Sequence, residues 1–145
     1  FRCGTRQSAR VLSAQGLDVY LYNFNFHFHG YIDPKSEFCY LDDELLCGVF
    51  HSSELKYVFD NLGPFVGDSD RRVAGYLGKY WSNMAKYGTP NGPAGDANAQ
   101  EYWPVYNVST DLHLEITDTL SVQSGLAKER CDFWDSLPRQ GVYPH

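Results

Sequence analysis

Apolar and polar positions along the chain repeat with a helical period in four segments and with a strand period in two. The clearest helix is predicted over residues 70–87, where one face is apolar and Gly88 follows as a stop signal. Shorter helices are predicted over residues 5–15, 52–61 and 125–137. The apolar face of the longest helix comprises Val73, Leu77, Tyr80, Trp81, Met84 and Tyr87.

Two details of the shorter helices follow from the same pattern. Ser52 or Ser53 is available as the N-cap of the helix predicted over residues 52–61, because either hydroxyl can accept a backbone N–H of the first turn. In the last helix, Ala127, Cys131 and Trp134 share the face that we expect to be buried.

The two predicted strands differ in how they are covered. Residues 18–26 (DVYLYNFNF) place Tyr20, Tyr22, Phe24 and Phe26 on one face and Val19 and Leu21 on the other. Apolar side chains on both faces are typical of a strand inside an α/β sheet. Residues 111–117 (DLHLEIT) alternate like a strand at a sheet edge.

A strand covered on both faces needs neighbouring strands, and the pattern predicts only one other. We therefore expect an α/β fold in which residues 1–145 form one segment of a single domain. Its sheet is expected to be incomplete without polypeptide outside this sequence. Phe1-Arg2-Cys3 does not open a signal peptide, and the chain begins as an internal fragment or a processed subunit would.

Composition and charge narrow the classes of partner. The chain has 145 residues, of which 43% are hydrophobic, and its formal net charge is −6. The longest basic run is Arg71-Arg72, so nucleic-acid binding is not expected. No apolar run approaches the roughly 18 residues of a membrane span.

Four cysteines point to an oxidising compartment. They show no Cys-x-x-Cys spacing, so disulfides are favoured over zinc and a secreted or lumenal location is expected. Three pairings are possible, among which Cys39–Cys47 would close a short loop and leave Cys3–Cys131 to join the two ends. Asn107 begins an Asn-x-Ser glycosylation triplet, which agrees with that compartment.

The candidate chemistry centres on His51. It stands in a short turn before an apolar helical segment, where the ring stays reachable while the helix fixes it, as a general base requires. The alternative is an ordinary histidine at a helix start. His27 and His29 share a strand face and are a possible metal pair, but without a third ligand a solvent-facing strand end is favoured and no metal site is predicted. The run Asp42-Asp43-Glu44 is interpreted as a solvated loop rather than as a group that orients His51 or binds a cation.

Six short motifs occur in a fixed order along the chain. They are Phe1-x-Cys3, VYLYNF at 19–24, GVFHSSE at 48–54, WSNMAKYGTPN at 81–91, WPVY at 103–106 and CDFW at 131–134. Together they resemble the C-terminal quarter of the type-B carboxylesterases, the cholinesterase-like branch of the α/β-hydrolases. The resemblance covers nearly the whole chain. Met84 stands where that family usually has phenylalanine.

The resemblance implies a Ser–Glu/Asp–His triad in which His51 is the base. It implies Cys3–Cys131 as the family's late disulfide, whereas Cys39–Cys47 is outside the general family pattern and rests on spacing alone. It also implies that Glu54 is a buried glutamate that shapes the active site. The alternative for Glu54 is an acid favoured at a helix N-terminus by the helix dipole.

No Gly-x-Ser-x-Gly occurs in the sequence, so the serine and the triad acid are expected in an N-terminal portion that is either missing or a separate chain. The chain is thus predicted to be the histidine-bearing portion of a secreted serine carboxylesterase, inert by itself. The complete enzyme would hydrolyse a small-molecule or lipid carboxylic ester without a cofactor. The alternative function is that of a non-catalytic cholinesterase-like adhesion or carrier module.

Overall fold

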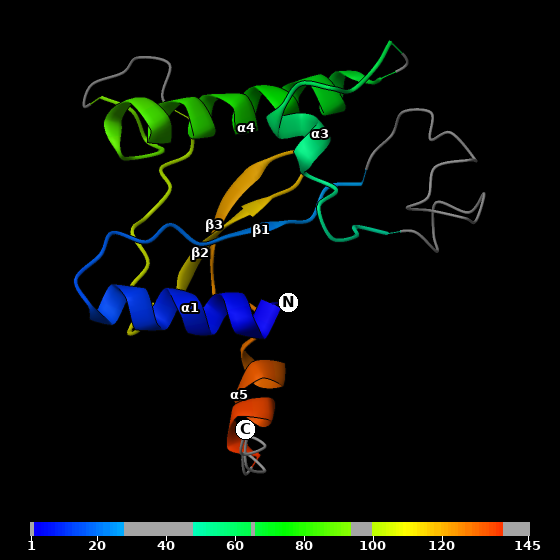
Figure 1. The fold of residues 1–145 in the computed structure, drawn as a ribbon. Helices are drawn as coiled ribbons and strands as arrows, with labels where there is room; N and C mark the ends of the chain where they lie inside the picture. The colour runs from blue at the N-terminus through cyan, green and yellow to red at the C-terminus, as the bar shows by residue number, and fades with distance from the viewer. Residues whose placement is uncertain (1, 28–47, 65, 94–99, 138–145) are drawn as a thin grey trace, which may run out of the picture. The chain divides into compact units, whose positions relative to one another are not determined.

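The computed structural model describes residues 2–27, 48–64, 66–93 and 100–137, and every structural statement below concerns these residues. Their helices and strands follow one another along the chain as drawn in Figure 1. The elements are α1 (Arg2–Ala14), β1 (Tyr22–Phe24), α3 (Leu55–Val58), α4 (Asp68–Tyr87), β2 (Leu112–Ile116), β3 (Leu120–Ser124) and α5 (Lys128–Ser136). The chain divides into two compact units, and each is described by itself.

The first unit contains residues 1–21, 104–113 and 123–145. Helix α1 packs against α5, and the Cys3–Cys131 disulfide links them with their Cα atoms 5.1 Å apart. The pairing that spacing and resemblance predicted is therefore present. A small apolar core is formed by Ala9, Leu21, Tyr106 and Leu126, with Val19 packed against it.

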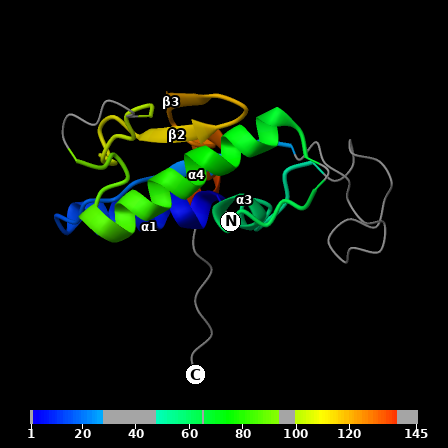
Figure 2. The same ribbon diagram turned by 90° about the horizontal axis from the view of Figure 1, so that it is seen from above.

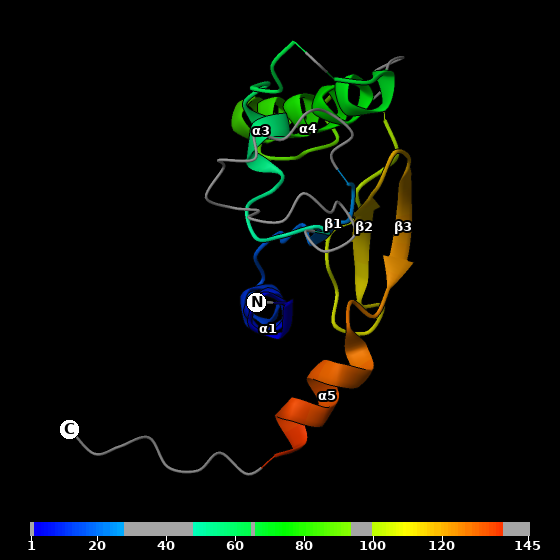
Figure 3. The ribbon, with the colours of Figure 1, turned by 90° about the vertical axis from the view of Figure 1, so that its right-hand side faces the viewer.

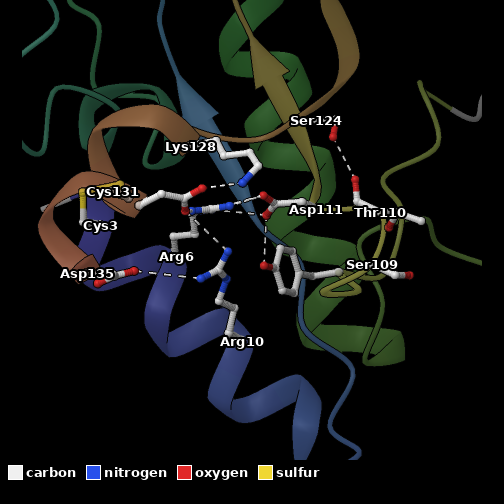
Figure 4. A network of polar contacts seen from close by, with 12 residues as sticks. Cys3, Arg6, Arg10, Ser109, Thr110, Asp111, Ser124, Lys128, Cys131 and Asp135 are labelled. Atoms are coloured by element: carbon white, nitrogen blue, oxygen red, sulfur yellow. Dashed lines mark hydrogen bonds and ion pairs between the residues drawn. A yellow bond between two sulfur atoms is a disulfide. The ribbon is translucent and has the colours of Figure 1, made fainter.

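A buried ion-pair network joins α1 to two other parts of this unit (Figure 4). Arg6 is only 1% exposed, and its Nε donates to both carboxylate oxygens of Asp111 at 3.3 and 3.2 Å, while its Nη2 pairs with the same group. Its Nη1 donates to Asp132 at 2.9 Å. The Tyr106 hydroxyl donates to Asp111 at 3.0 Å. Because a buried guanidinium is costly unless every face is paired, this network fixes how α1 sits in the unit.

The second unit contains residues 22–103 and 114–122. Strand β1 pairs in parallel with β2, with Tyr22 opposite Leu114 and Phe24 opposite Ile116. The strand order is β1-β2-β3, and the arrows of β2 and β3 point in opposite directions in Figure 3. The sheet is therefore mixed, and β1 stands at one end of the strand order among the described residues.

Helix α4 is the longest element of the second unit, and α3 lies beside it in two views (Figures 1 and 2). The first turn of α4 is closed by Asp70, whose Oδ2 accepts the backbone N–H of Gly67 at 3.1 Å. It ends at Gly88, whose φ of 71° is in the left-handed region that glycine adopts without strain. The buried face of α4 comprises Asp70, Val73, Ala74, Leu77 and Tyr80.

Several predicted boundaries and faces are corrected by the structure. Strand β3 was not predicted, and because it pairs with β2, the segment 111–117 is not a sheet edge. Met84 and Tyr87 are exposed, the latter by 54%, although both repeat with the buried residues of α4. Trp134 is also exposed, although Cys131 on the same predicted face is buried.

The helix and strand ends also shift from the predicted ranges. Strand β1 covers three residues of the predicted 18–26, and α5 covers nine residues within the predicted 125–137. Neither Ser52 nor Ser53 is an N-cap, because α3 begins at Leu55 and Glu54 takes the cap position. None of the helices in the described part of the chain combines the length and apolar character that crossing a membrane requires.

Candidate functional site

His51 opens a tight turn, residues 51–54, that leads into α3. The Ser53 N–H donates to Phe50 O, and the Leu55 N–H donates to Ser52 O, each at 3.2 Å. Ser52 has a φ of 68°, a conformation that side chains other than glycine, asparagine and aspartate rarely adopt. His51 itself is exposed. The turn therefore presents the imidazole to solvent on a backbone held by local hydrogen bonds.

Helix α3 is anchored through the side chain of Tyr57. This residue is fully buried, and its hydroxyl donates to Asp70 Oδ1 at 2.9 Å. Its ring contacts Phe24 and Phe26, with centroids 5.4 and 5.6 Å away. Burial and the hydrogen bond to the Asp70 carboxylate raise the pKa of Tyr57, so its hydroxyl stays protonated as the donor. The helix behind His51 is thus fastened to both β1 and α4.

Glu54 makes no capping hydrogen bond from its side chain, although it occupies the N-cap position of α3. Its Oε1 instead lies 3.5 Å from the hydroxyl of Tyr22, a long contact, and Glu54 is half-buried. The Tyr22 ring makes edge contacts with Trp81 and Trp103, with centroids 5.4 and 5.7 Å away. Burial, with a smaller effect of the Glu54 charge, raises the pKa of Tyr22 to about 12. Glu54 therefore stands at the start of α3 with its carboxylate beside Tyr22 of a partly buried aromatic cluster.

Sequence reasoning missed two features of this turn. Tyr22 meets Glu54 through a tertiary contact, which no local pattern reveals. Ser53 is buried, and its Oγ has no hydrogen-bond partner within the described residues. A buried hydroxyl without a partner costs about 1–3 kcal/mol. The sequence signals for these residues were the motif at 19–24 for Tyr22 and the motif around His51 for Ser53.

The remaining predicted site residues fall in different places. His27 is exposed, while His29, Asp42, Asp43 and Glu44 lie outside the described residues. Cys39 and Cys47 also lie outside them, so that pairing stays a prediction. In the described ranges, no group of three or more His, Cys, Asp or Glu side chains is arranged to hold a metal ion.

Asn107 lies in the first unit, on an exposed turn formed by residues 107–110. Its Oδ1 accepts the Ser109 N–H at 2.8 Å and the Ser109 hydroxyl at 2.6 Å. The described geometry thus places the predicted glycosylation triplet at the surface of its unit.

Comparison with known proteins agrees with this arrangement of elements. The family described as "Carboxylesterase family" matches residues 1–134 of the chain. The chain therefore belongs to the carboxylesterase family, whose fold is the α/β-hydrolase fold. The mixed sheet with its helices is consistent with part of such a domain.

Individual relatives show the same relationship. Human carboxylesterase 5A is 28% identical over 137 residues, which cover 89% of this chain and 21% of that protein. Bovine carboxylesterase 4A is 29% identical over 142 residues, covering 94% of this chain and 22% of that protein. Acetylcholinesterase of Electrophorus electricus is 31% identical over 100 residues, covering 63% of this chain and 16% of that protein. The chain spans about a fifth of the length of these carboxylesterases.

Proposed function

We propose that this chain is the histidine-bearing portion of a serine carboxylesterase and that His51 is the general base. The observation that supports this most directly is the exposed His51 on an anchored turn in a chain of the carboxylesterase family. Its partner is an N-terminal portion of the same domain, which supplies the serine and the Glu or Asp of the triad. The substrate is a small-molecule or lipid carboxylic ester, and no cofactor takes part.

In the assembled enzyme, His51 removes the proton from the serine hydroxyl as the serine oxygen attacks the ester carbonyl. The resulting imidazolium then protonates the leaving alkoxide, which leaves an acyl-serine. In the deacylation half of the reaction, His51 takes a proton from water as the water oxygen attacks the acyl carbonyl. The serine oxygen then leaves and receives that proton from His51. Glu54, held beside Tyr22, supports the site without acting as the triad acid.

Apolar side chains after His51 support a shared site. Phe59 is 74% exposed, and Leu55, four residues earlier along α3, is also exposed. Exposed apolar side chains in the segment after the base are what a covering part of the same domain would bury. Without that covering part the chain has no nucleophile and is inert.

The Cys3–Cys131 disulfide supports placing the protein outside the cytosol. Structural disulfides persist in secreted, lumenal or cell-surface proteins, where thiols are not kept reduced. We therefore propose that the enzyme is made in the secretory pathway.

The proposal is tested by producing this chain together with the polypeptide encoded upstream of it and measuring hydrolysis of p-nitrophenyl acetate. His51→Ala should reduce kcat/KM by at least about a thousandfold, as loss of a triad base does. His27→Ala is the matched control, because His27 is an exposed histidine of the same unit, and its kcat/KM should be unchanged.

Three outcomes are decisive. A large loss in His51→Ala alone supports the base assignment. Equal activity of both variants would refute it. An assembled protein that folds and has no ester turnover at all would favour the non-catalytic adhesion or carrier module.

A further inference from the structure

We infer that Asn107 is the acceptor of one asparagine-linked glycan, attached at its Nδ2 atom. This inference stands apart from the proposed ester hydrolysis and concerns the other unit of the chain. Asn107-Val108-Ser109 is the single Asn-x-Ser/Thr triplet in the sequence. Such triplets also occur by chance, so the inference depends on where the fold places this one.

The turn that holds the triplet is open to solvent along its whole length. Asn107, Val108, Ser109 and Thr110 are all exposed, and Val108 is exposed although it is apolar. A glycan is bulky and hydrophilic, so it needs an acceptor with free space on its side. Residues 107–110 meet this requirement in the folded unit.

The hydrogen bonds of the turn leave the reacting nitrogen unused. Asn107 Oδ1 accepts both the N–H and the hydroxyl of Ser109, and the backbone carbonyl of Asn107 accepts the Asp111 N–H at 2.7 Å. No hydrogen bond in the described part of the chain involves Asn107 Nδ2. Since Oδ1 and Nδ2 lie on opposite sides of the amide, a sugar on Nδ2 preserves the bonds that shape the turn.

The base of the turn is fixed to the rest of its unit (Figure 4). The Ser124 hydroxyl donates to Thr110 O at 2.8 Å, and the Gly125 N–H donates to Asp111 O at 2.9 Å. Asp111 is in turn buried against Arg6. The acceptor thus projects from a turn that is hydrogen-bonded to the rest of its unit.

The transfer balances with a donor of known chemical class, a polyprenyl-diphosphate-linked oligosaccharide of the secretory pathway. A bond forms between Asn107 Nδ2 and C1 of the first sugar. The bond between C1 and the diphosphate oxygen breaks, and the lipid diphosphate leaves with that electron pair. The amide nitrogen gives up one proton to a base of the transferase.

The test directs the full chain into the secretory pathway of a eukaryotic cell and measures its intact mass before and after treatment with peptide N-glycosidase. Wild type and Ser109→Thr should each carry one glycan that the enzyme removes, leaving aspartate at position 107. Ser109→Ala and Asn107→Asp should emerge without it. An unmodified wild-type chain after passage through that pathway would overturn the inference, and so would a glycan that persists in Asn107→Asp.

A second measurement separates a glycan acceptor from an asparagine that only shapes the turn. Asn107→Asp retains an oxygen that accepts both Ser109 bonds, whereas Asn107→Ala retains none. We expect the urea midpoints of Asn107→Asp and of wild type produced without glycosylation, which keeps its asparagine, to agree, while Asn107→Ala is lower. An Asn107→Asp midpoint as low as that of Asn107→Ala would contradict the assignment of the turn bonds to the amide oxygen alone.

Discussion

Arg6 and Asp111 form a buried ion pair although 105 residues separate them in the chain. The guanidinium meets the carboxylate through its Nε and Nη2 atoms, and it reaches Asp132 through Nη1. These bonds raise the pKa of Arg6, so the pair stays ionised. The pair therefore connects the first helix to the segment before β2 in a single geometry.

Replacing Arg6 should be among the most damaging single changes in the first unit. Arg6→Met leaves the buried Asp111 carboxylate with the Tyr106 hydroxyl and only the longer-range charge of Arg10, which costs about 3–5 kcal/mol. Arg10→Met is the matched control, because Arg10 is partly exposed and its ion-pair contacts with Asp132 and Asp135 are long, at 3.9 Å. It should cost less than about 1 kcal/mol. Urea unfolding followed by circular dichroism gives both values. Equal losses of unfolding free energy in the two variants would show that the buried pair contributes no more to stability than the contacts of Arg10.

The same network should give the first unit a stability that is lost in acid. Hydrogen bonds from Lys128 and Arg6 lower the pKa of Asp132 to about 2. The pKa of Asp111 is also lowered, because although burial favours the protonated form, the hydrogen bonds from Arg6 and Tyr106 outweigh that effect. A carboxylate with a depressed folded pKa stabilises the fold above its unfolded pKa, near 3.9, and that contribution disappears as the pH falls toward the folded value.

Asp132→Asn removes one of these titrations. Between about pH 4 and pH 2, the unfolding free energy of the variant should depend less steeply on pH than that of wild type. The difference should correspond to at most about one proton fewer bound on unfolding. Urea titrations at several pH values measure the slope. A variant that retains the wild-type slope would show that Asp132 titrates at its ordinary pKa.

Tyr57 should be essential to the second unit for its hydroxyl as well as its ring. Tyr57→Phe keeps the ring contacts with Phe24 and Phe26 but removes the hydroxyl that donates to the buried Asp70. Losing a hydrogen bond to a buried charge costs about 1.5–3 kcal/mol. Tyr87→Phe makes the same chemical change on an exposed residue of α4 and should cost almost nothing. Thermal unfolding of the two variants would contradict this account if their midpoints fell equally.

The positive φ of Ser52 should control the placement of His51. Valine is β-branched and rarely adopts φ near 68°, so Ser52→Val should cost about 1–3 kcal/mol and distort the turn. Ser52→Gly suits the same conformation and should be nearly neutral. The NMR resonances of the His51 ring report the outcome directly. They should shift in Ser52→Val and stay unchanged in Ser52→Gly. Unchanged resonances in both variants would show that the conformation of the turn does not control the surroundings of the His51 ring.

Local periodicity predicted the buried face of α4 as far as Tyr80. The disulfide from Cys3 to Cys131 followed from spacing and resemblance. Strand β3 was missed because residues 120–124 (LSVQS) are short and polar, and its Val122 is exposed. The turn 117–119, where the Thr117 N–H donates to Thr119 O, has no glycine and so gives no hairpin signal in the sequence. Met84 and Tyr87 repeat with the buried face but are exposed, because tertiary packing and not periodicity decides which turns of a helix are covered.

At the candidate site, the sequence predicted that His51 precedes a helix but did not predict the conformation of the turn. The rule that serine caps helices favoured Ser52 or Ser53, whereas the left-handed φ of Ser52 moves the helix start to Leu55. The contact between Tyr22 and Glu54 joins residues 32 apart in sequence, so no local pattern contains it.

The Cys3–Cys131 disulfide has a topological consequence. Its sequence separation is 128 residues, so nearly the whole chain, including all of the second unit, lies inside one covalent ring. A single proteolytic cut between these cysteines therefore opens the ring without releasing a fragment, and the pieces separate only after reduction. On a gel, such a nicked protein keeps its full mass under non-reducing conditions and divides into two bands once a thiol is added.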